Sequence, residues 1–299
     1  MWKLFKSHQK WIISENFDKI SQVLQQTRRM VTKGHPSLAA VLKNLREFAP
    51  EHLAESWDNV GLLIEPSTAK PISGIILTND LTEDVLRDAV NAHAGLIISY
   101  HPPIFEGLKR ITQDKWKGRI VASCLENGIA VYSPHTAWDS VRGGVNDWLG
   151  SFLSKEFDAG QPIIPNAKHP DCGAGRLYES LKDGMTLEEI INGLKSHTKI
   201  PNLPVALVHP LTQRIKSVAL CAGSGASVLK DQKVEVFITG EMAHHAILDA
   251  NHCGTSVILT HHSNSERGFL TEMQGMLQKD FPEVSIICST ADKDPLTIG

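Results

Sequence analysis

The chain has 299 residues, of which 41% are hydrophobic and 21% charged, and its formal net charge is −3. A chain of this length buries a large core in one or two domains. The near-neutral balance gives no global electrostatic reason to bind nucleic acid or an anionic membrane, because both favour clustered positive charge. No apolar run reaches the roughly 20 residues that a membrane-spanning helix needs. Direct nucleic-acid and membrane partners are therefore excluded from the expected function.

The N-terminal 36 residues differ in pattern from the rest of the chain. They are rich in Lys and Arg, carry Glu15 and Asp18 as acidic residues, and repeat apolar side chains at roughly helical spacing. Such a basic amphipathic arm is typical of a mitochondrial presequence, whereas its two acidic residues favour a helical extension docked on the body. Five scattered cysteines without a Cys-x-x-Cys pair indicate reduced thiols. We expect a cytoplasmic protein, with the mitochondrial matrix as the alternative.

From residue 37 onward, helices and strands alternate. In chain order the pattern predicts a helix over 38–48, strands over 60–64 and 73–77, a helix over 82–92, a strand over 96–99, a helix over 119–126, a strand over 129–132, a helix over 187–196, a strand over 215–221, a helix starting at 227–230, a strand over 234–238, a helix over 241–250, a strand over 256–259, a helix over 266–277 and a strand over 284–288. Thr82 is a candidate N-cap, and Gly128 a candidate helix stop.

This alternation predicts the α/β class, with two interlinked and internally similar domains. We assign residues 37–150 to the first domain and 151–299 to the second, which includes a linking segment over 160–210 that is richer in Pro and Gly.

The two halves of the chain repeat one arrangement of polar residues. Residues 73–80 align with 234–241, and the residues that follow keep equal offsets. The equivalent pairs are Thr78 with Thr239, Asp80 with Glu241, Asp88 with Asp249, and His101 with His262. Matched spacing over this length indicates an internal duplication. Residues just past the carboxyl ends of parallel strands line the ligand crevice of open α/β sheets, so we expect both histidines there.

Three loops at strand ends carry histidine with or near an acid. His262 and Glu266 are four residues apart where a strand turns into a helix, so both can reach one face and share a cation. His101 is followed by two prolines, and His135 precedes Asp139. Each pattern alone also occurs as a structural cap or surface pair. Together they predict a site with nitrogen and oxygen ligands for one or two transition metals.

Two other features are candidates of lower weight. His244 and His245 lie near a helix N-terminus and either orient a substrate or form a surface pair. The Gly-rich turn over 222–227 either presents backbone N–H groups to phosphate or is a tight structural turn, which we favour because a Walker lysine is lacking.

Several longer motifs carry a resemblance to a known family. They are LAESWDNVGLL over 53–63, SYHPPIF over 99–105, SPHTAWD over 133–139, GGVN over 143–146, CGAGR over 172–176, TGEMAHH over 239–245 and HHSNSERG over 261–268. In this order they resemble the Nif-three-like family, also labelled GTP cyclohydrolase I type two-like, and above all its eukaryotic members. The resemblance covers residues 36–299. It implies a two-domain α/β fold, a toroidal homohexamer and a dinuclear metal site between the domains.

By the same resemblance, the metal ligands are His101, Asp139, His262 and Glu266, with Asp139 or Glu266 as the bridging carboxylate. The ions would be divalent, such as Zn, Fe or Mn. One position departs from the family pattern, since many bacterial members have His-His-Pro where this chain has Tyr100-His101-Pro102. A phenol loses its proton only near pH 10 and is a poor ligand at neutral pH. This departure predicts that the second ion is weakly bound or absent.

Two hypotheses for function remain open from the sequence. The first is a metal-dependent hydrolase acting on a phosphate-containing or nucleotide-like substrate, with His135, His244 and His245 as candidates for proton transfer or substrate orientation. The second is a non-catalytic protein-interaction scaffold or transcriptional co-regulator, because the family's name comes from a partner interaction. A site with few protein ligands for two ions keeps coordination positions open, which favours catalysis. Expected partners are the protein itself as a homohexamer, a small phosphate-containing molecule, or another protein.

Overall fold

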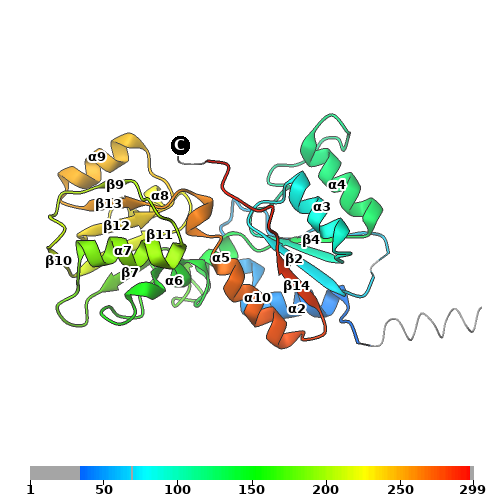
Figure 1. Ribbon diagram of the computed structural model, residues 1–299, viewed down its shortest axis with the longest axis horizontal. Helices are drawn as coiled ribbons and strands as arrows, with labels where there is room; N and C mark the ends of the chain where they lie inside the picture. The colour runs from blue at the N-terminus through cyan, green and yellow to red at the C-terminus, as the bar shows by residue number, and fades with distance from the viewer. Residues whose placement is uncertain (1–33, 69, 297–299) are drawn as a thin grey trace, which may run out of the picture.

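Two five-stranded sheets, one in each half of the molecule, form the frame of the structure, a computed structural model that describes residues 34–68 and 70–296 (Figure 1). The first sheet has the order β1-β4-β3-β2-β14. Its strands are β1 (Gly61–Ile64), β2 (Gly74–Thr78), β3 (Leu96–Ser99), β4 (Ala130–Ser133) and β14 (Ser285–Cys288). All neighbours are parallel except the edge strand β1, which is antiparallel to β4.

Helices cover both faces of the first sheet because its strands carry apolar side chains on both faces. α3 (Glu83–Asn91) and α4 (Trp116–Asn127) pack on the face that carries Ile76 and Ile97. α2 (Leu38–Phe48) and α10 (Phe269–Asp280) pack on the opposite face. The predicted Thr82 cap is confirmed, since its hydroxyl accepts from the Val85 N–H at 3.3 Å.

The second sheet has the order β7-β11-β12-β13-β9. Its strands are β7 (Arg176–Glu179), β9 (Val205–Ala206), β11 (Ser217–Cys221), β12 (Val236–Thr239) and β13 (Ser256–Leu259). The three central strands are parallel, and both edge strands are antiparallel. Its helices are α6 (Val145–Gly150), α7 (Leu187–Thr198), α8 (Ala226–Leu229) and α9 (His244–His252). The predicted α/β class with two similar domains is therefore confirmed.

Short elements complete the chain. They are the helix α5 (Thr136–Ser140), the 3₁₀ turns η1 (Glu51–Leu53), η2 (Ser151–Leu153) and η3 (Ser263–Ser265), and the strand pairs β5 (Ile164–Pro165) with β6 (Gly173–Ala174) and β8 (Met185–Thr186) with β10 (Arg214–Ile215). α5 lies between the two lobes (Figure 1).

The C-terminal segment interlinks the lobes. After β13 of the second sheet, the chain forms α10 and then β14, which joins the first sheet beside β2 (Figure 1). The strand expected over 284–288 is present, but it belongs to the sheet of the first lobe although we assigned its residues to the second domain. The physical reason is that every residue of β2 is buried, so its backbone groups need a strand partner on each side.

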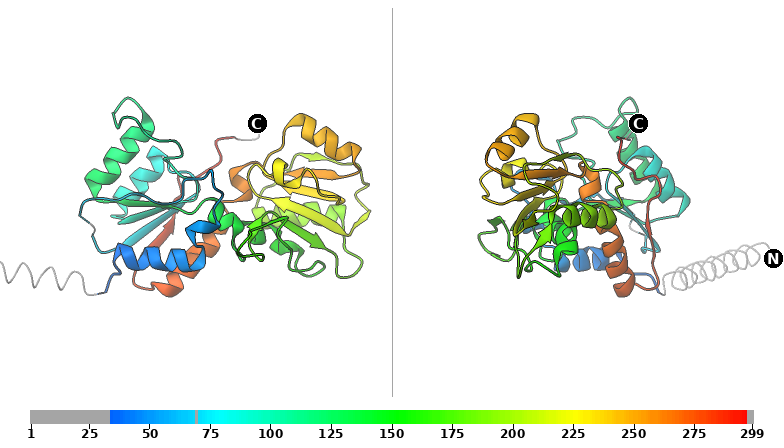
Figure 2. Two further views of the ribbon diagram at one scale, coloured as in Figure 1. Left: turned by 180° about the vertical axis from the view of Figure 1, so that it is seen from behind. Right: turned by 60° about the vertical axis from the view of Figure 1, so that its left-hand side comes forward.

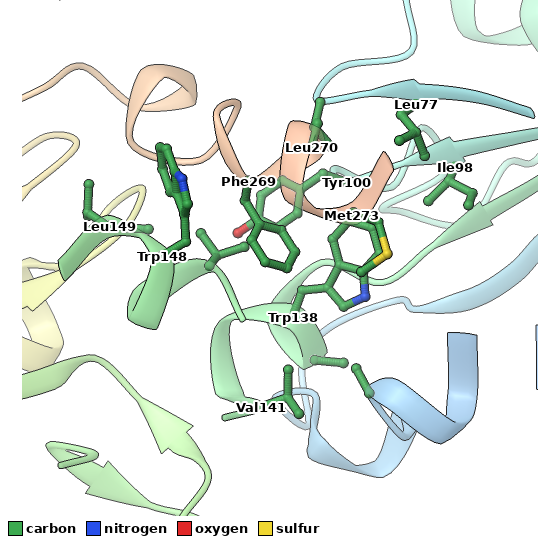
Figure 3. Close-up of a cluster of buried hydrophobic side chains, with 14 of the residues drawn as sticks. Leu77, Ile98, Tyr100, Trp138, Val141, Trp148, Leu149, Phe269, Leu270 and Met273 are labelled. Carbon is green, nitrogen blue, oxygen red and sulfur yellow. The ribbon is translucent and has the colours of Figure 1, made fainter. Parts of the chain in front are cut away.

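One hydrophobic cluster runs through both lobes. At the junction, the rings of Trp138 and Phe269 meet edge to face with centroids 5.4 Å apart, and Tyr100 packs beside them (Figure 3). Trp138 of α5 has no exposed surface. Because the cluster includes side chains from both sheets, the lobes share a core. Figure 2 shows the two lobes from two further sides.

The predicted arm over residues 1–36 lies outside the described residues, apart from its last three. Among the residues that the structure describes, no helix is long and apolar enough to cross a membrane.

Candidate metal centre

The two repeated units bring His101 and His262 together, with ring centroids 5.2 Å apart. His101 follows β3, and its Nδ1 lies 3.0 Å from Asp80 Oδ1. His262 follows β13, and its Nδ1 lies 3.0 Å from Glu241 Oε1. The sequence repeat thus becomes a repeated contact, in which a carboxylate after one strand orients the imidazole after the next. Such hydrogen bonds at Nδ1 leave Nε2 as the nitrogen available to an ion.

Glu266 lies between the two Nε2 atoms. One of its carboxylate oxygens is 3.4 Å from His101 Nε2 and the other is 3.4 Å from His262 Nε2, while the residue is only 3% exposed. The three donor atoms lie within 4.8 Å of one another. Two imidazoles and one carboxylate form a donor set that suits transition ions such as Zn, Fe or Mn.

The charge around His101 favours a cation. Burial lowers the pKa of His101, but hydrogen bonds to Asp80 and Glu266 outweigh it and raise this pKa to about 10. Burial also opposes ionisation of Asp80, yet its hydrogen bond to His101 holds the carboxyl pKa below the usual range. Without an ion, a proton on His101 compensates the surrounding carboxylates. A metal ion in that place would supply the same positive charge.

A glycine keeps space open above the donor atoms. Gly223 has φ +61°, and a Cβ atom there would lie 2.6 Å from Glu266 Oε1 and 3.2 Å from His262 Nε2. A side chain at this position would fill the space beside the ligands. The open space and the donor set both fit an ion held by His101, His262 and Glu266.

Asp139, the fourth expected ligand, lies beside this group and is bound to Tyr100. The Tyr100 hydroxyl donates a hydrogen bond to Asp139 Oδ1 at 2.6 Å. Burial raises the pKa of Tyr100 well above its usual value, so the phenol keeps its proton. Burial also raises the pKa of Asp139 to about 6. One oxygen of Asp139 is thus used by a neighbouring side chain, and its role as a ligand stays a prediction.

A cavity of about 400 Å³ opens beside the donor group. Both lobes line it, with Trp57, His135 and Asp139 from the first half of the chain and Ser224 and Ser227 from the second, together with His262 and Glu266. A second cavity of about 340 Å³ is lined by His101, Asp80, Phe105 and Trp116, and His135 lines both. The candidate metal group therefore lies where a small molecule can reach it.

The Gly-rich turn over 222–227 uses two of its N–H groups internally. Gly223 donates to Ser265 Oγ at 2.7 Å, and Gly225 donates to Thr239 Oγ1 at 3.1 Å. Both bonds fix the turn against the second repeat. For these two groups the structural interpretation holds.

The other candidates occupy different places. His244 and His245 are exposed on α9 with their rings 5.3 Å apart, and neither lines the two cavities at the donor group. His135, in contrast, is held at the cavity by Asp58, which accepts from its Nδ1 at 2.7 Å.

Two residues at the site, Asp58 and Asn79, were given no functional role from the sequence. Asn79 is fully buried, and its amide donates to Glu266 Oε2 at 3.1 Å. The contact of Asp58 with His135 spans 77 residues and that of Asn79 with Glu266 spans 187, so local sequence patterns do not reveal them. Asp58 was signalled only by its place in the motif over 53–63.

The fold and the site define a two-lobed α/β protein with a histidine–carboxylate group between duplicated halves. The model of the Duf34/NIF3 family (NGG1p interacting factor 3) matches residues 36–295, and the chain belongs to this family.

Curated relatives match over most of their length. The chain is 49% identical to NIF3-like protein 1 of Drosophila melanogaster, with 90% of this chain and 91% of the relative covered. It is 35% identical to NIF3-like protein 1 of Homo sapiens over 87% of this chain and 92% of the relative. It is 38% identical to NGG1-interacting factor 3 of Saccharomyces cerevisiae, with 91% of this chain and 99% of the relative covered.

Solved structures share the fold at lower identity. A Bacillus cereus protein related to NIF3 superimposes with a TM-score of 0.78 at 21% identity, covering 89% of this chain and all of that one. Reduced HcgD from Methanocaldococcus jannaschii superimposes with a TM-score of 0.72 at 22% identity, covering 84% of this chain and 97% of that one. At these identities the likeness establishes the fold alone.

Proposed function

We propose that the protein is a metal-dependent hydrolase of a phosphate-containing or nucleotide-like substrate. The observation that carries the proposal is the convergence of His101, His262 and Glu266 beside a cavity large enough for a small molecule. Three protein ligands leave positions open on an ion that takes four to six, which is the pattern of catalytic rather than structural sites. A divalent ion there would act as a Lewis acid, lower the pKa of water and stabilise an anionic transition state.

The chain's own residues around the cavity supply the other requirements. Ser224 and Ser227 line it, and serine hydroxyls can donate hydrogen bonds to phosphate oxygens. Trp57 also lines it, is 61% exposed, and offers a flat apolar surface to a planar ring. His135 also lines it, and we assign it the transfer of a proton. His244 and His245 remain candidates for orienting a longer substrate.

A hydrolysis panel tests this function. Phosphate monoesters, phosphodiesters and nucleotides are offered to the full chain after loading with Zn²⁺, Fe²⁺ or Mn²⁺. We expect one class to turn over and His262→Ala to abolish that turnover; this side chain is 40% exposed, so its removal spares the fold. His252→Ala, which replaces an exposed histidine on α9, is the matched control and keeps full activity. Loss in both variants, or turnover that survives His262→Ala, contradicts the proposal.

The competing function is a protein-interaction scaffold or transcriptional co-regulator. It is favoured by the name of the yeast relative, which describes an interaction with NGG1. The panel separates the two: an ion that stays bound while no substrate turns over supports the scaffold. Under that outcome the exposed aromatic rings of Trp57, Phe105 and Trp116 around the two cavities become the first candidates for a contact surface.

Two further properties belong to the proposal. We expect a homohexamer in solution, and a molar mass measured by light scattering near that of one chain contradicts it. We expect the protein in the cytoplasm, or in the mitochondrial matrix if the basic arm is a presequence. N-terminal sequencing of the native protein decides between these locations, because an intact Met1 or Trp2 start is incompatible with a cleaved arm.

A further inference from the structure

Asp58 is a buried carboxylate that forms several hydrogen bonds with the segment around His135. It lies between η1 and β1, and its side chain has no exposed area. One carboxylate oxygen, Oδ1, lies 2.7 Å from His135 Nδ1 and also accepts from the backbone N–H of Asn59 at 2.7 Å. The other, Oδ2, accepts from the backbone N–H of Thr136 at 3.2 Å and from the Thr136 hydroxyl. Each oxygen therefore accepts from one backbone N–H and faces one side-chain donor, which fixes the orientation of the carboxylate.

The contact fixes which ring nitrogen of His135 carries the proton. An ionised carboxylate only accepts hydrogen bonds, so the neutral imidazole must place its hydrogen on Nδ1. Nε2 is then the lone-pair nitrogen, and among the described residues none forms a hydrogen bond with it. The ring borders both cavities at the candidate metal centre. Nε2 is thus left for a bound molecule.

His135 has a strained backbone conformation that its neighbours must stabilise. His135 has φ +35° and ψ −120°, a left-handed region that side-chain-bearing residues avoid. The strain is retained by the Asp58 contacts and by the His135 N–H, which donates to the Tyr100 carbonyl at 3.2 Å. Trp57 and Phe105 meet the ring edge to face. Retained strain of this kind is concentrated at functional sites, where it presets the direction of a side chain.

We propose that Asp58 is a positioning residue that holds His135 as the Nδ1–H tautomer, with Nε2 as the proton acceptor for hydrolysis at the neighbouring centre. This role rests on the proposed function. Nε2 takes one proton from water while the water oxygen bonds to phosphorus. The bond from phosphorus to the leaving oxygen breaks, and that oxygen takes the proton from Nε2. The products are a phosphate and an alcohol, and His135 returns to its starting state.

The substitution Asp58→Ala tests the tautomer. Asp58→Asn is unsuitable, because both oxygens of the side chain accept from backbone N–H groups and the amide NH₂ would oppose one of them in either orientation. Ala removes the acceptor that holds the hydrogen on Nδ1, and a neutral imidazole without such a partner prefers the Nε2–H form. We expect imidazole ¹⁵N spectra of the full-length protein, recorded where the ring is neutral, to show Nδ1–H in the wild type and mainly Nε2–H in folded Asp58→Ala. The signal is assigned by its loss in His135→Gln.

Asp171→Ala, which removes an exposed carboxylate, is the matched control and leaves the His135 signals unchanged. A wild-type Nε2–H tautomer, or the same tautomer in wild type and folded Asp58→Ala, overturns the proposal. This readout needs no substrate, so it fails or succeeds independently of the hydrolase assignment. With a substrate from the panel, kcat should fall roughly 10²–10⁴-fold in Asp58→Ala while KM and metal content stay near wild type. A tautomer switch without a fall in kcat refutes the proton-transfer role of His135.

Discussion

Arg176 is a fully buried cation at the junction of the lobes, and its replacement should destabilise the whole fold. Its guanidinium binds Asp147 of α6 through two hydrogen bonds of 2.9 Å. The remaining donors satisfy four backbone carbonyls, those of Gly173, Gly175, Ser140 and Val141. Arg176→Met fills a similar volume but removes every one of these donors.

The loss of stability is large because the charge of Asp147 and the four backbone carbonyls remain in place without Arg176. Asp147 keeps Arg142 at 3.1 Å and the Gly143 N–H at 2.7 Å, whereas the four carbonyls lose a charged donor inside the protein. Removing one partner of a buried ion pair costs about 3–5 kcal/mol. For a chain of this size the cost corresponds to a Tm lower by roughly 6–20 °C.

Thermal and urea unfolding followed by circular dichroism measure the effect. Arg176→Lys keeps the charge without the planar fork, so we expect an intermediate loss. Lys43→Met is the exposed control, because its pair with Glu47 at 3.6 Å is open to water and should leave Tm unchanged. A change of roughly 2–4 °C in Tm corresponds to about 1 kcal/mol in a chain of this size. A Tm of Arg176→Met within about 2 °C of wild type therefore refutes the expected destabilisation.

Three further outcomes are expected. Tyr100→His should raise the metal content from about one ion per chain toward two, because it adds an imidazole beside the site, whereas Tyr100→Phe should not; equal contents refute this. Asp80→Asn and Glu241→Gln, which remove the Nδ1 partners of two ligands, should each weaken metal affinity roughly 10–100-fold in a chelator competition, and unchanged affinity contradicts the ligand assignment. Burial lowers the pKa of His197, whose Nε2 donates to the Trp148 carbonyl at 2.8 Å. Since the unfolded chain takes up this proton near pH 6.5, stability should fall as the pH drops below that value, and urea unfolding of His197→Gln should show a flatter dependence.

The local elements were predictable because their signals are local. α2 has the predicted bounds, since an apolar stripe, Ser37 as N-cap and Pro50 define it within a few residues. Elements near the site begin later than their apolar pattern suggests. α9 starts at His244 and α10 at Phe269, because Glu241 and Glu266 lie in the preceding loops, where their carboxylates turn to the histidines. The functional contacts override helix propensity at these positions.

Long-range contacts were predictable only through the repeat. Equal offsets in the two halves placed His101 and His262 at equivalent strand ends, and the structure brings them to one carboxylate. Nothing repeated marks Asp58, whose contact with His135 is formed by tertiary packing. The pairing of β14 with β2 was equally hidden, because an apolar strand pattern does not specify which sheet it joins.

The proposed function requires that His101, His262 and Glu266 bind a metal ion. The most direct measurement is the metal content per chain of the full-length, untagged protein, determined by elemental analysis after loading and removal of excess ion. We predict one tightly bound transition ion in the wild type and in His252→Ala. In folded Glu266→Gln and His262→Ala it should be lost. A metal-free wild type, or ions retained in both variants, would show that these side chains do not form a metal site.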